Sequence, residues 1–260
     1  MQQAIPYFCA HLGEVESQWK ADETRVTEAD LHLSRLFEEG LRTAFPEDDF
    51  CSEEDAATET ARPLQATYAW VVDPIDGTNN FALGFPSCAI SLGLLRDGEP
   101  IYGWIYDAAR RVVIEGGPGY GVTCGGRNLP SLIPHNPVRD TIYVAVHTPW
   151  GEQIAPALAP LLEVCKIRAM GSSALHLALV AGGIYDAAVD FNVKVWDIAA
   201  GVAIARALGA EVHFFNGPVF PLRTFSVRAG PLHYFACRPG LGDRLRALIR
   251  YPRDSTRARH

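Results

Sequence analysis

The sequence has no cysteine pair at a spacing typical of metal or redox sites. Its six cysteines are scattered over 260 residues, and none of them forms a C-x-x-C pair. This distribution fits neither a disulfide framework nor a zinc knuckle. We therefore expect reduced cysteines, mostly packed in the interior of a cytoplasmic protein.

Long apolar runs, a basic leader and an excess of positive charge are also absent. No window of about 18 apolar residues occurs, so no membrane-spanning helix is predicted. The first residues show no basic region followed by an apolar stretch, so we expect no signal peptide. The 23 lysines and arginines against 30 aspartates and glutamates give a formal net charge of −7. That balance argues against general electrostatic binding of nucleic acid and suits a protein that gathers acids around cations.

The remaining composition is that of an ordinary soluble globular protein. Hydrophobic residues make up 48% of the chain and charged residues 20%, at a length that suits one large domain or two small ones. The composition changes around residues 134–141, which contain two prolines. We therefore predict an N-terminal α+β half over residues 1–138 and a C-terminal α/β half over residues 139–260.

The most informative stretch is an apolar run that ends in two acids. Tyr68–Val72 is predicted as a buried strand, and Asp73 and Asp76 follow it directly. Carboxylates are the hard oxygen ligands that divalent cations prefer. Gly77 then lets backbone N–H groups approach an anion closely. A divalent-metal site beside a phosphate site is one interpretation, and a strand that ends in an ordinary acidic turn is the other.

Upstream of this stretch the pattern is mainly helical. We expect a short helix within residues 1–19, a surface loop over residues 20–26, and a helix from Thr27 to about Ala44. Thr27 is a good N-cap, and Asp30 stands at the position of its capping-box partner. Residues 47–55 contain six acids, for which both a solvated loop and a cation site stay open.

Downstream, strands come first and then alternate with helices. Closely spaced apolar segments predict an antiparallel meander. Its strands cover residues 88–95, 100–106, 112–115 and 119–124. In the second half, extended segments are expected at residues 142–146, 166–170, 185–190, 211–215 and 234–237, and helices at 152–164, 172–181, 196–208 and 241–250. The basic end of the chain, residues 250–260, is expected to be disordered.

Five separated stretches together resemble the inositol monophosphatase family of metal-dependent phosphomonoesterases. They are Val26–Asp30 (VTEAD), Ser52–Asp55 (SEED), Asp73–Thr78 (DPIDGT), Arg168–Ser173 (RAMGSS) and Trp196–Gly201 (WDIAAG). Glu53 also lies 20 residues before Asp73, as in the family. The resemblance implies a layered α+β fold, an αβαβα sandwich with the site between the two halves, and a homodimer.

The resemblance also implies a cofactor, two or three Mg²⁺ ions per active site. Glu53, Asp73 and the backbone carbonyl of Ile75 would bind one ion, and Asp73, Asp76 and Asp197 a second. Glu53 would touch a third ion through water. Asp73 would then bridge two cations about 4 Å apart, as in two-metal phosphatases.

The catalytic roles that the resemblance implies centre on a metal-activated water. Thr78, hydrogen-bonded to Asp30, would position this water for attack on phosphorus, and Glu53 is a further proton acceptor. The N–H groups of Gly77 and Thr78 would face the phosphate at a helix N-terminus. The capping and catalytic roles of Asp30 are compatible because its carboxylate has two oxygens.

The C-terminal half is expected to bind the alcohol side of the substrate. In the family, the segment from Gly171 through Ser172 to Ser173 borders a sugar or cyclitol. Asp190 would contact its hydroxyl groups, at a position where glutamate is more usual. Because Asp190 also ends a predicted strand, a purely structural acid stays open as the alternative.

The function implied is Mg²⁺-dependent hydrolysis of a small polyol phosphate monoester, with inositol monophosphate as the leading substrate. Histidinol phosphate, fructose 1,6-bisphosphate and 3′-phosphonucleotides are alternative substrates for the same fold. A non-catalytic regulatory homologue is the alternative of a different class. We expect no nucleic-acid or membrane partner.

Overall fold

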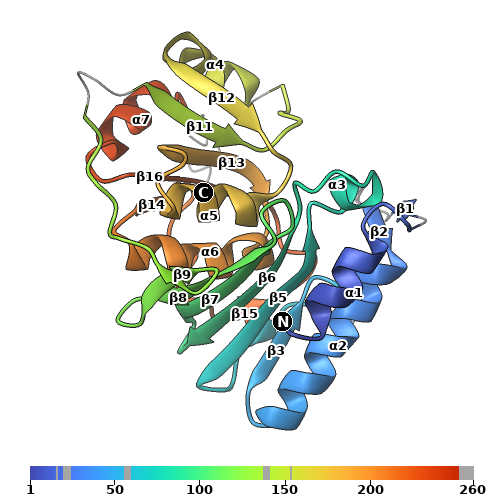
Figure 1. Ribbon diagram of the computed structural model, residues 1–260. Helices are drawn as coiled ribbons and strands as arrows, with labels where there is room; N and C mark the ends of the chain where they lie inside the picture. The colour runs from blue at the N-terminus through green and yellow to red at the C-terminus, as the bar shows by residue number, and fades with distance from the viewer. Residues whose placement is uncertain (16, 20–24, 56–59, 137–140, 153, 252–260) are drawn as a thin grey trace, which may run out of the picture.

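The protein is built from five alternating layers of helix and sheet. The computed structural model describes residues 1–15, 17–19, 25–55, 60–136, 141–152 and 154–251. Figure 1 shows the layers in the order helices α1 and α2, a first sheet, helices α5 and α6, a second sheet, and helices α4 and α7. This is the αβαβα arrangement predicted, so the fold class is confirmed.

The described helices are short to medium in length. They are α1 (Ala4–His11), α2 (Glu28–Ala44), α3 (Thr78–Ala82), α4 (Ala155–Val164), α5 (Ser173–Ala181), α6 (Val195–Ala207) and α7 (Gly242–Leu248). Thr27 and Asp30 form the predicted capping box of α2, and Ser172 caps α5 as expected. Within α2, Leu33 and Phe37 lie one turn apart and pack against the first sheet.

The first sheet has seven strands in the order β10-β9-β8-β7-β6-β5-β3. They are β3 (Asp49–Ser52), β5 (Tyr68–Asp76), β6 (Ala89–Arg96), β7 (Glu99–Asp107), β8 (Val112–Gly117), β9 (Gly121–Cys124) and β10 (Arg127–Asn128). Strands β6 to β9 form the predicted antiparallel meander, which β5 and β10 extend at its two ends, and β3 pairs with β5 in parallel. One face of this sheet packs on α1 and α2, and the other on α5 and α6.

The second sheet has five strands in the order β12-β11-β13-β16-β14. They are β11 (Ile142–Val146), β12 (Cys165–Ala169), β13 (Ala187–Val193), β14 (Glu211–Phe214) and β16 (Leu232–Cys237). The first three run parallel, and β16 is antiparallel to β13 and β14. Four short strands pair outside the two sheets, β1 (Ser17–Trp19) with β2 (Arg25–Thr27), and β4 (Arg62–Pro63) with β15 (Thr224–Phe225).

The middle layer joins the two halves of the chain. Helices α5 and α6 are apolar around nearly their whole circumference because both of their sides are covered by a sheet. Helix α6 lies directly on the first sheet, where a Cβ on Gly103 would stand 2.3 Å from the carbonyl oxygen of Ala200. Only glycine permits this close approach, and it fixes the distance between the middle of α6 and strand β7.

The structure limits two sequence predictions for the first half. The short helix expected within residues 1–19 is α1, which ends at His11, and Gly13, with φ 79°, precedes the strand Ser17–Trp19. The acidic run is not wholly a loop, because Asp49–Ser52 form β3. Asp49 accepts hydrogen bonds from the backbone of Gln65 and Ala66, so its charge anchors a turn.

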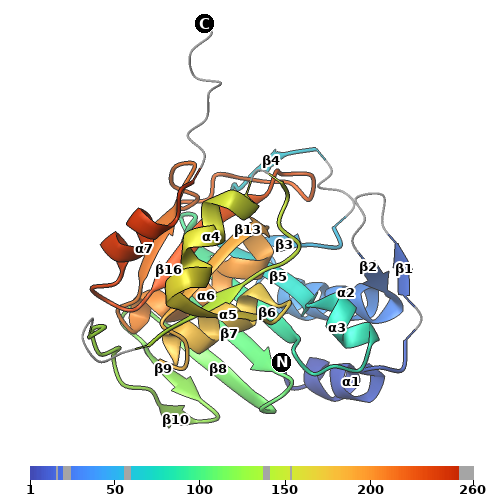
Figure 2. The same ribbon diagram turned by 90° about the horizontal axis from the view of Figure 1, so that it is seen from above.

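Three further predictions concern the domain boundary, membrane-spanning helices and the cysteines. The predicted boundary at residues 138 and 139 and the basic tail from residue 252 lie outside the described residues. The two sheets fall on either side of that boundary and pack on the same helices, α5 and α6, which lie near the middle of the view in Figure 2. Among the helices described, none is long and apolar enough to cross a bilayer. All six cysteines are free thiols, and Cys51, Cys88 and Cys237 are buried.

Candidate metal centre and active site

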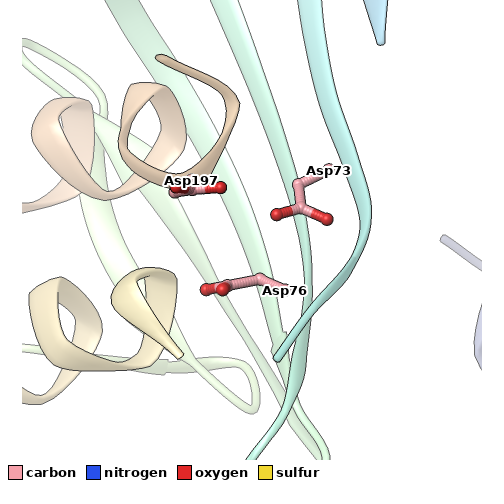
Figure 3. A group of neighbouring side chains, drawn as sticks. All are labelled: Asp73, Asp76 and Asp197. Carbon is pink, nitrogen blue, oxygen red and sulfur yellow. The ribbon is translucent and has the colours of Figure 1, made fainter. Parts of the chain in front are cut away.

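The centre of the site is the end of strand β5, where Asp73 and Asp76 are both buried. In a regular strand, residues three apart point to opposite faces of the sheet. Here the pairing register with β6 shifts between Asp73 and Asp76. This irregularity turns both carboxylates toward the same place, as Figure 3 shows.

Asp197 completes the cluster from the first turn of α6. Oxygen atoms of Asp73, Asp76 and Asp197 all lie within 4.8 Å of one another, and the three side chains converge in Figure 3. Asp73 and Asp197 come close enough to share a hydrogen bond. Asp197 also accepts a 2.7 Å hydrogen bond from the backbone N–H of Lys194, which orients its carboxylate at the start of the helix.

Burial and mutual repulsion disfavour the charged forms of these acids. Burial is the largest cause that raises the pKa of Asp73, followed by the charges of Glu53, Asp76 and Asp197. The pKa of Asp197 is raised well above its usual value by burial and then by Asp76 and Glu53. For Asp76, burial raises the pKa, and hydrogen bonds from α5 offset part of this. A bound divalent cation would remove this repulsion, so the donor set fits Mg²⁺.

Glu53 lies beside the cluster, directly after β3. Its backbone N–H donates a 3.2 Å hydrogen bond to the carbonyl of Val72, the residue before Asp73. The half-buried Glu53 carboxylate is close enough to raise the pKa of both Asp73 and Asp197. The parallel pairing of β3 with β5 therefore brings a fourth acid to the site from 20 residues upstream.

Asp30 uses its two carboxylate oxygens for different partners. Oδ2 accepts hydrogen bonds from the backbone N–H (2.7 Å) and hydroxyl (2.6 Å) of Thr27. Oδ1 lies 3.4 Å from the hydroxyl of Thr78, which also donates to the carbonyl of Ile75 at 3.0 Å. The predicted pair of Asp30 and Thr78 is thus in contact, and the capping role of Asp30 coexists with it.

Asp76 connects the cluster to the second half of the chain. Its carboxylate accepts hydrogen bonds from the Ser172 hydroxyl (2.8 Å) and from the backbone N–H groups of Ser173 (3.3 Å) and Ala174 (2.5 Å). These donors lie at the N-terminus of α5, where the helix dipole also favours a negative charge. Ser172 and Ser173 are buried, and the structure places both against Asp76.

Two glycines at the junction of the halves make the same connection through the backbone. Gly77, the N-cap of α3, has φ 92°, and a Cβ there would lie 2.9 Å from the carbonyl oxygen of Gly171. Gly171 has φ 77° and leaves no room for a Cβ beside Asn80. The predicted phosphate-binding and substrate-binding glycines are therefore in direct contact across the two halves.

Asp190 is near the cluster but faces the interior. Its side chain is 0% exposed, and its carboxylate lies 3.1 Å from Nδ1 of His176 and accepts a 3.0 Å hydrogen bond from the hydroxyl of Tyr234. Burial raises the pKa of Asp190, but the charge and hydrogen bond of His176 outweigh it, and the net pKa is lowered. These contacts favour the structural role that the sequence left open over direct contact with substrate hydroxyls.

The partners of Asp190 were missed at the level of sequence. His176 lies in the otherwise apolar helix α5 and Tyr234 in the apolar strand β16, and both are fully buried. A lone polar side chain within an apolar helix or strand was the available signal, since buried polar groups need partners. Trp196, next to Asp197, is buried and packs edge-on against Phe225, as expected for a core residue.

The raised pKa values predict how the metal-free protein responds to pH. Asp73 and Asp197 have pKa values above their usual 3.8 in the folded state, so the folded protein binds more protons than the unfolded chain. This stabilisation is complete below the unfolded pKa and is lost as the pH rises through the folded pKa. Urea unfolding in EDTA should give a lower free energy of unfolding at about pH 8 than at about pH 5, and Mg²⁺ should restore the loss. A metal-free protein that gains stability over this interval would contradict the prediction.

Fold and site together define a layered α+β protein with a carboxylate-lined site for divalent cations. The inositol monophosphatase family model matches residues 4–242, so the chain belongs to this family, and with it to the phosphoric monoester hydrolases.

Individual relatives agree with this assignment. The chain is 30% identical over 258 residues to inositol-1-monophosphatase ImpA of Mycolicibacterium smegmatis, covering 95% of this chain and 87% of the relative. It is 29% identical over 219 residues to Nus factor SuhB of Xylella fastidiosa, covering 81% and 78%. A crystal structure of an IMPase/NADP phosphatase complexed with Mg²⁺ and phosphate superposes with a TM-score of 0.80 at 21% identity, covering 96% of this chain and 92% of the other.

Proposed function

We propose that this protein is a Mg²⁺-dependent phosphatase of small polyol phosphate monoesters, with inositol monophosphate as the leading substrate. The observation that carries the proposal is the convergence of Asp73, Asp76 and Asp197 within 4.8 Å, in a chain that belongs to this family. The name of the Mycolicibacterium relative supports the substrate, and the Mg²⁺ and phosphate in the similar crystal structure support the metal. Histidinol phosphate, fructose 1,6-bisphosphate and 3′-phosphonucleotides are the alternative substrates.

The proposed metal ligands are the carboxylates of Glu53, Asp73, Asp76 and Asp197, with the carbonyl of Ile75, for two or three ions. Bound Mg²⁺ supplies a Lewis acid that polarises phosphate oxygens and lowers the pKa of a water molecule. Glu53 directly after β3, Asp73 and Asp76 on β5, and Asp197 on α6 are held by three different elements, so the four acids are oriented before the substrate arrives. Because the acids are already in place, the cluster can stabilise the transition state without reorganising during the reaction.

Asp30 and Thr78 are proposed to position the attacking water. The Thr78 hydroxyl lies between Asp30 Oδ1 and the carbonyl of Ile75, which are both acceptors. Its proton therefore points toward them, and the lone pairs of its oxygen point away. Glu53 is a further acceptor for the proton that the water gives up. Backbone N–H groups at Gly77 and Thr78 would bind the phosphate oxygens, where a glycine with positive φ lets the backbone come close.

A regulatory role is the second candidate, because one relative is named a Nus factor. A protein that kept the fold only for binding would have no need for buried carboxylates that repel one another. The cluster retains them at a cost in stability, which favours catalysis. The net charge of −7 further argues against RNA as a direct partner.

Phosphate release from a panel of phosphomonoesters, with Mg²⁺ and with EDTA, tests the proposed function. The expected result is Mg²⁺-dependent turnover, with kcat/KM ranking inositol 1-phosphate against histidinol phosphate, fructose 1,6-bisphosphate and 3′-phosphonucleotides. Absence of metal-dependent turnover on every ester would exclude the phosphatase and leave the regulatory role. We also propose a homodimer, which sedimentation of the purified protein tests.

Thr78→Ala should lower kcat by about a hundredfold or more, a typical loss for a group that assists proton transfer. Thr27→Ala is the matched control, because Thr27 binds the other oxygen of Asp30. It should cost about 1 kcal/mol of stability through the lost helix cap and keep most of the activity. Steady-state kinetics and urea unfolding of both variants measure the two effects. If kcat fell equally in the two variants, Asp30 would act only by holding α2 in position, and not through its contact with Thr78.

A further inference from the structure

Asn80 links the two halves of the chain beside the carboxylate cluster. It lies in α3, and its side-chain amide nitrogen donates two hydrogen bonds. One goes to the backbone carbonyl of Ser87 (2.7 Å) in the first half, and the other to the carbonyl of Met170 (2.8 Å) in the second. An amide oxygen cannot donate, so the atom that faces two carbonyls is the nitrogen. Both N–H bonds of the Asn80 amide are therefore used.

The carbonyl of Met170 has a second donor from the first half. The buried hydroxyl of Ser87 donates to it at 2.8 Å. Asn80, Ser87 and the Met170 carbonyl thus form a closed triangle of three hydrogen bonds, which we call the Asn80 latch. Two of these bonds join residues that are 90 and 83 positions apart in the chain. Hydrogen bonds in such a network strengthen one another, so the Met170 carbonyl is held firmly.

The latch packs directly against the turn that follows Asp76. A Cβ on Gly77 would lie 3.1 Å from the carbonyl oxygen of Ser87 and 2.9 Å from that of Gly171. A Cβ on Gly171 would lie 2.7 Å from the amide nitrogen of Asn80. Since both glycines also have positive φ, only glycine fits at either position. The backbone around the latch therefore has little room to shift.

The Met170 carbonyl lies two residues before the side chain that orients Asp76. Gly171 follows Met170, and next comes Ser172, the N-cap of α5. The hydroxyl of Ser172, a residue that is 0% exposed, donates a 2.8 Å hydrogen bond to Oδ2 of Asp76. Fixing the Met170 carbonyl fixes the peptide plane that joins Met170 to Gly171, so few backbone torsions separate the latch from Ser172. The orientation of the Asp76 carboxylate is thus expected to depend on the latch.

The association of the two halves has other and larger sources. Helices α5 and α6 bury apolar side chains against the first sheet over a continuous core. The hydroxyl of Ser91 also donates to the carbonyl of Trp196 at 3.3 Å. Burial of that apolar surface stabilises the fold far more than a few neutral hydrogen bonds do. The distinctive contribution of the latch is therefore the local geometry at Asp76.

We propose that Asn80 is a positioning residue that, through the Met170 carbonyl, holds Ser172 where its hydroxyl orients the Asp76 carboxylate for Mg²⁺. This inference rests on the proposed metal-dependent function and adds to it a residue that binds neither metal nor substrate. Partners that orient metal ligands typically account for about ten- to a hundredfold in metal affinity.

The test measures Mg²⁺ binding from the increase in Tm with Mg²⁺ concentration, which does not require turnover. Asn80→Ala should weaken Mg²⁺ binding by about tenfold or more. Ser87→Ala removes one of the two donors to the Met170 carbonyl, so it should weaken binding in the same direction by a smaller factor. Asn79→Ala is the matched control, because this neighbouring asparagine is exposed, and it should bind Mg²⁺ as the wild type does.

A double-mutant cycle separates the positioning role from a general loosening of the fold. If Asn80 acts through Ser172, the combination of Asn80→Ala with Ser172→Ala should bind Mg²⁺ about as weakly as Ser172→Ala alone. Losses that multiply would mean that the two residues act independently, and would overturn the inference. Wild-type Mg²⁺ binding by Asn80→Ala would overturn it as well.

The kinetics with inositol 1-phosphate give a second readout. At limiting Mg²⁺ the kcat of Asn80→Ala should be low, and it should recover when Mg²⁺ is raised by about the factor lost in affinity, tenfold or more. A kcat that stays low at saturating Mg²⁺ would contradict a role in positioning the metal ligand.

The binding measurements also separate this inference from the proposed function. A wild type that binds Mg²⁺ but hydrolyses no phosphomonoester would overturn the proposed function, and the cycle between Asn80 and Ser172 would still support the latch. A wild type whose Tm does not respond to Mg²⁺ would overturn both.

Discussion

Asp73→Asn should remove Mg²⁺-dependent turnover and at the same time stabilise the metal-free protein. Asp73 is the acid on which Glu53, Asp76 and Asp197 all exert repulsion, and it is 1% exposed. An amide at this position removes one buried charge, and its oxygen can still accept the 3.0 Å hydrogen bond from the N–H of Ile75. Activity should fall because the proposed metal site would lose one of its carboxylate ligands.

The expected sizes follow from the chemistry that is lost. Metal assistance is worth several kcal/mol, so kcat/KM should drop by about a thousandfold or more. The free energy of unfolding in EDTA at neutral pH should rise by about 1 kcal/mol, the equivalent of one pKa unit. The Mg²⁺-induced increase in Tm should shrink, which provides a readout of the site that does not depend on turnover.

Asp107→Asn is the control for Asp73→Asn. Asp107 is equally buried and lies at the end of β7 in the same sheet, but its partner is Arg110, at 2.6 Å. Its amide variant should lose stability and keep its Mg²⁺ response. Full activity of Asp73→Asn would remove Asp73 from the metal ligands. A lower free energy of unfolding in EDTA would show that repulsion between the acids does not destabilise the metal-free protein.

Asp190→Ala should give the largest loss of stability, about 3–5 kcal/mol, because it leaves the buried His176 and the Tyr234 hydroxyl without their shared partner. For a chain of this size the corresponding decrease in Tm is about 10 °C. Tyr234→Phe removes one hydrogen bond only and should cost about 1 kcal/mol. Urea unfolding of both single variants and the double variant measures the coupling between Asp190 and Tyr234.

The kinetics of Asp190→Ala distinguish its two predicted roles. As a structural acid, Asp190 should affect stability strongly and KM for inositol 1-phosphate only weakly at a temperature where the variant is folded. A variant of unchanged stability with a greatly increased KM would instead restore the substrate contact predicted from the sequence. The lowered pKa of Asp190 sets the pH range of its contribution, which is present above the usual carboxylate pKa and is lost as the pH falls through the folded value.

Local sequence was sufficient for most of the elements and for the identity of the cluster. Apolar segments and the turns between them indicated the meander and helix α6, and Thr27 with Asp30 marked the start of α2. These signals are local, because hydrophobic periodicity and capping depend on residues within a few positions of one another. The family motifs then named Asp73, Asp76 and Asp197 as ligands, although Asp197 lies more than 100 residues after the other two.

Only the tertiary structure decided which polar groups meet. Asp49 looked like part of a solvated acidic run, but in the structure it pairs in β3 with β5 and accepts hydrogen bonds from the backbone of the turn at Gln65 and Ala66. For Asp190 the sequence left both a substrate contact and a structural role open, and the packing of β13 brings its carboxylate against His176 on α5 and Tyr234 on β16. Each of these contacts joins residues that are distant in sequence, and the partner is chosen by strand register and helix packing, which no local pattern contains. The sequence therefore determined the residue types of the site. The packing of the two sheets on α5 and α6 determined which acids converge there and which are bound in the interior.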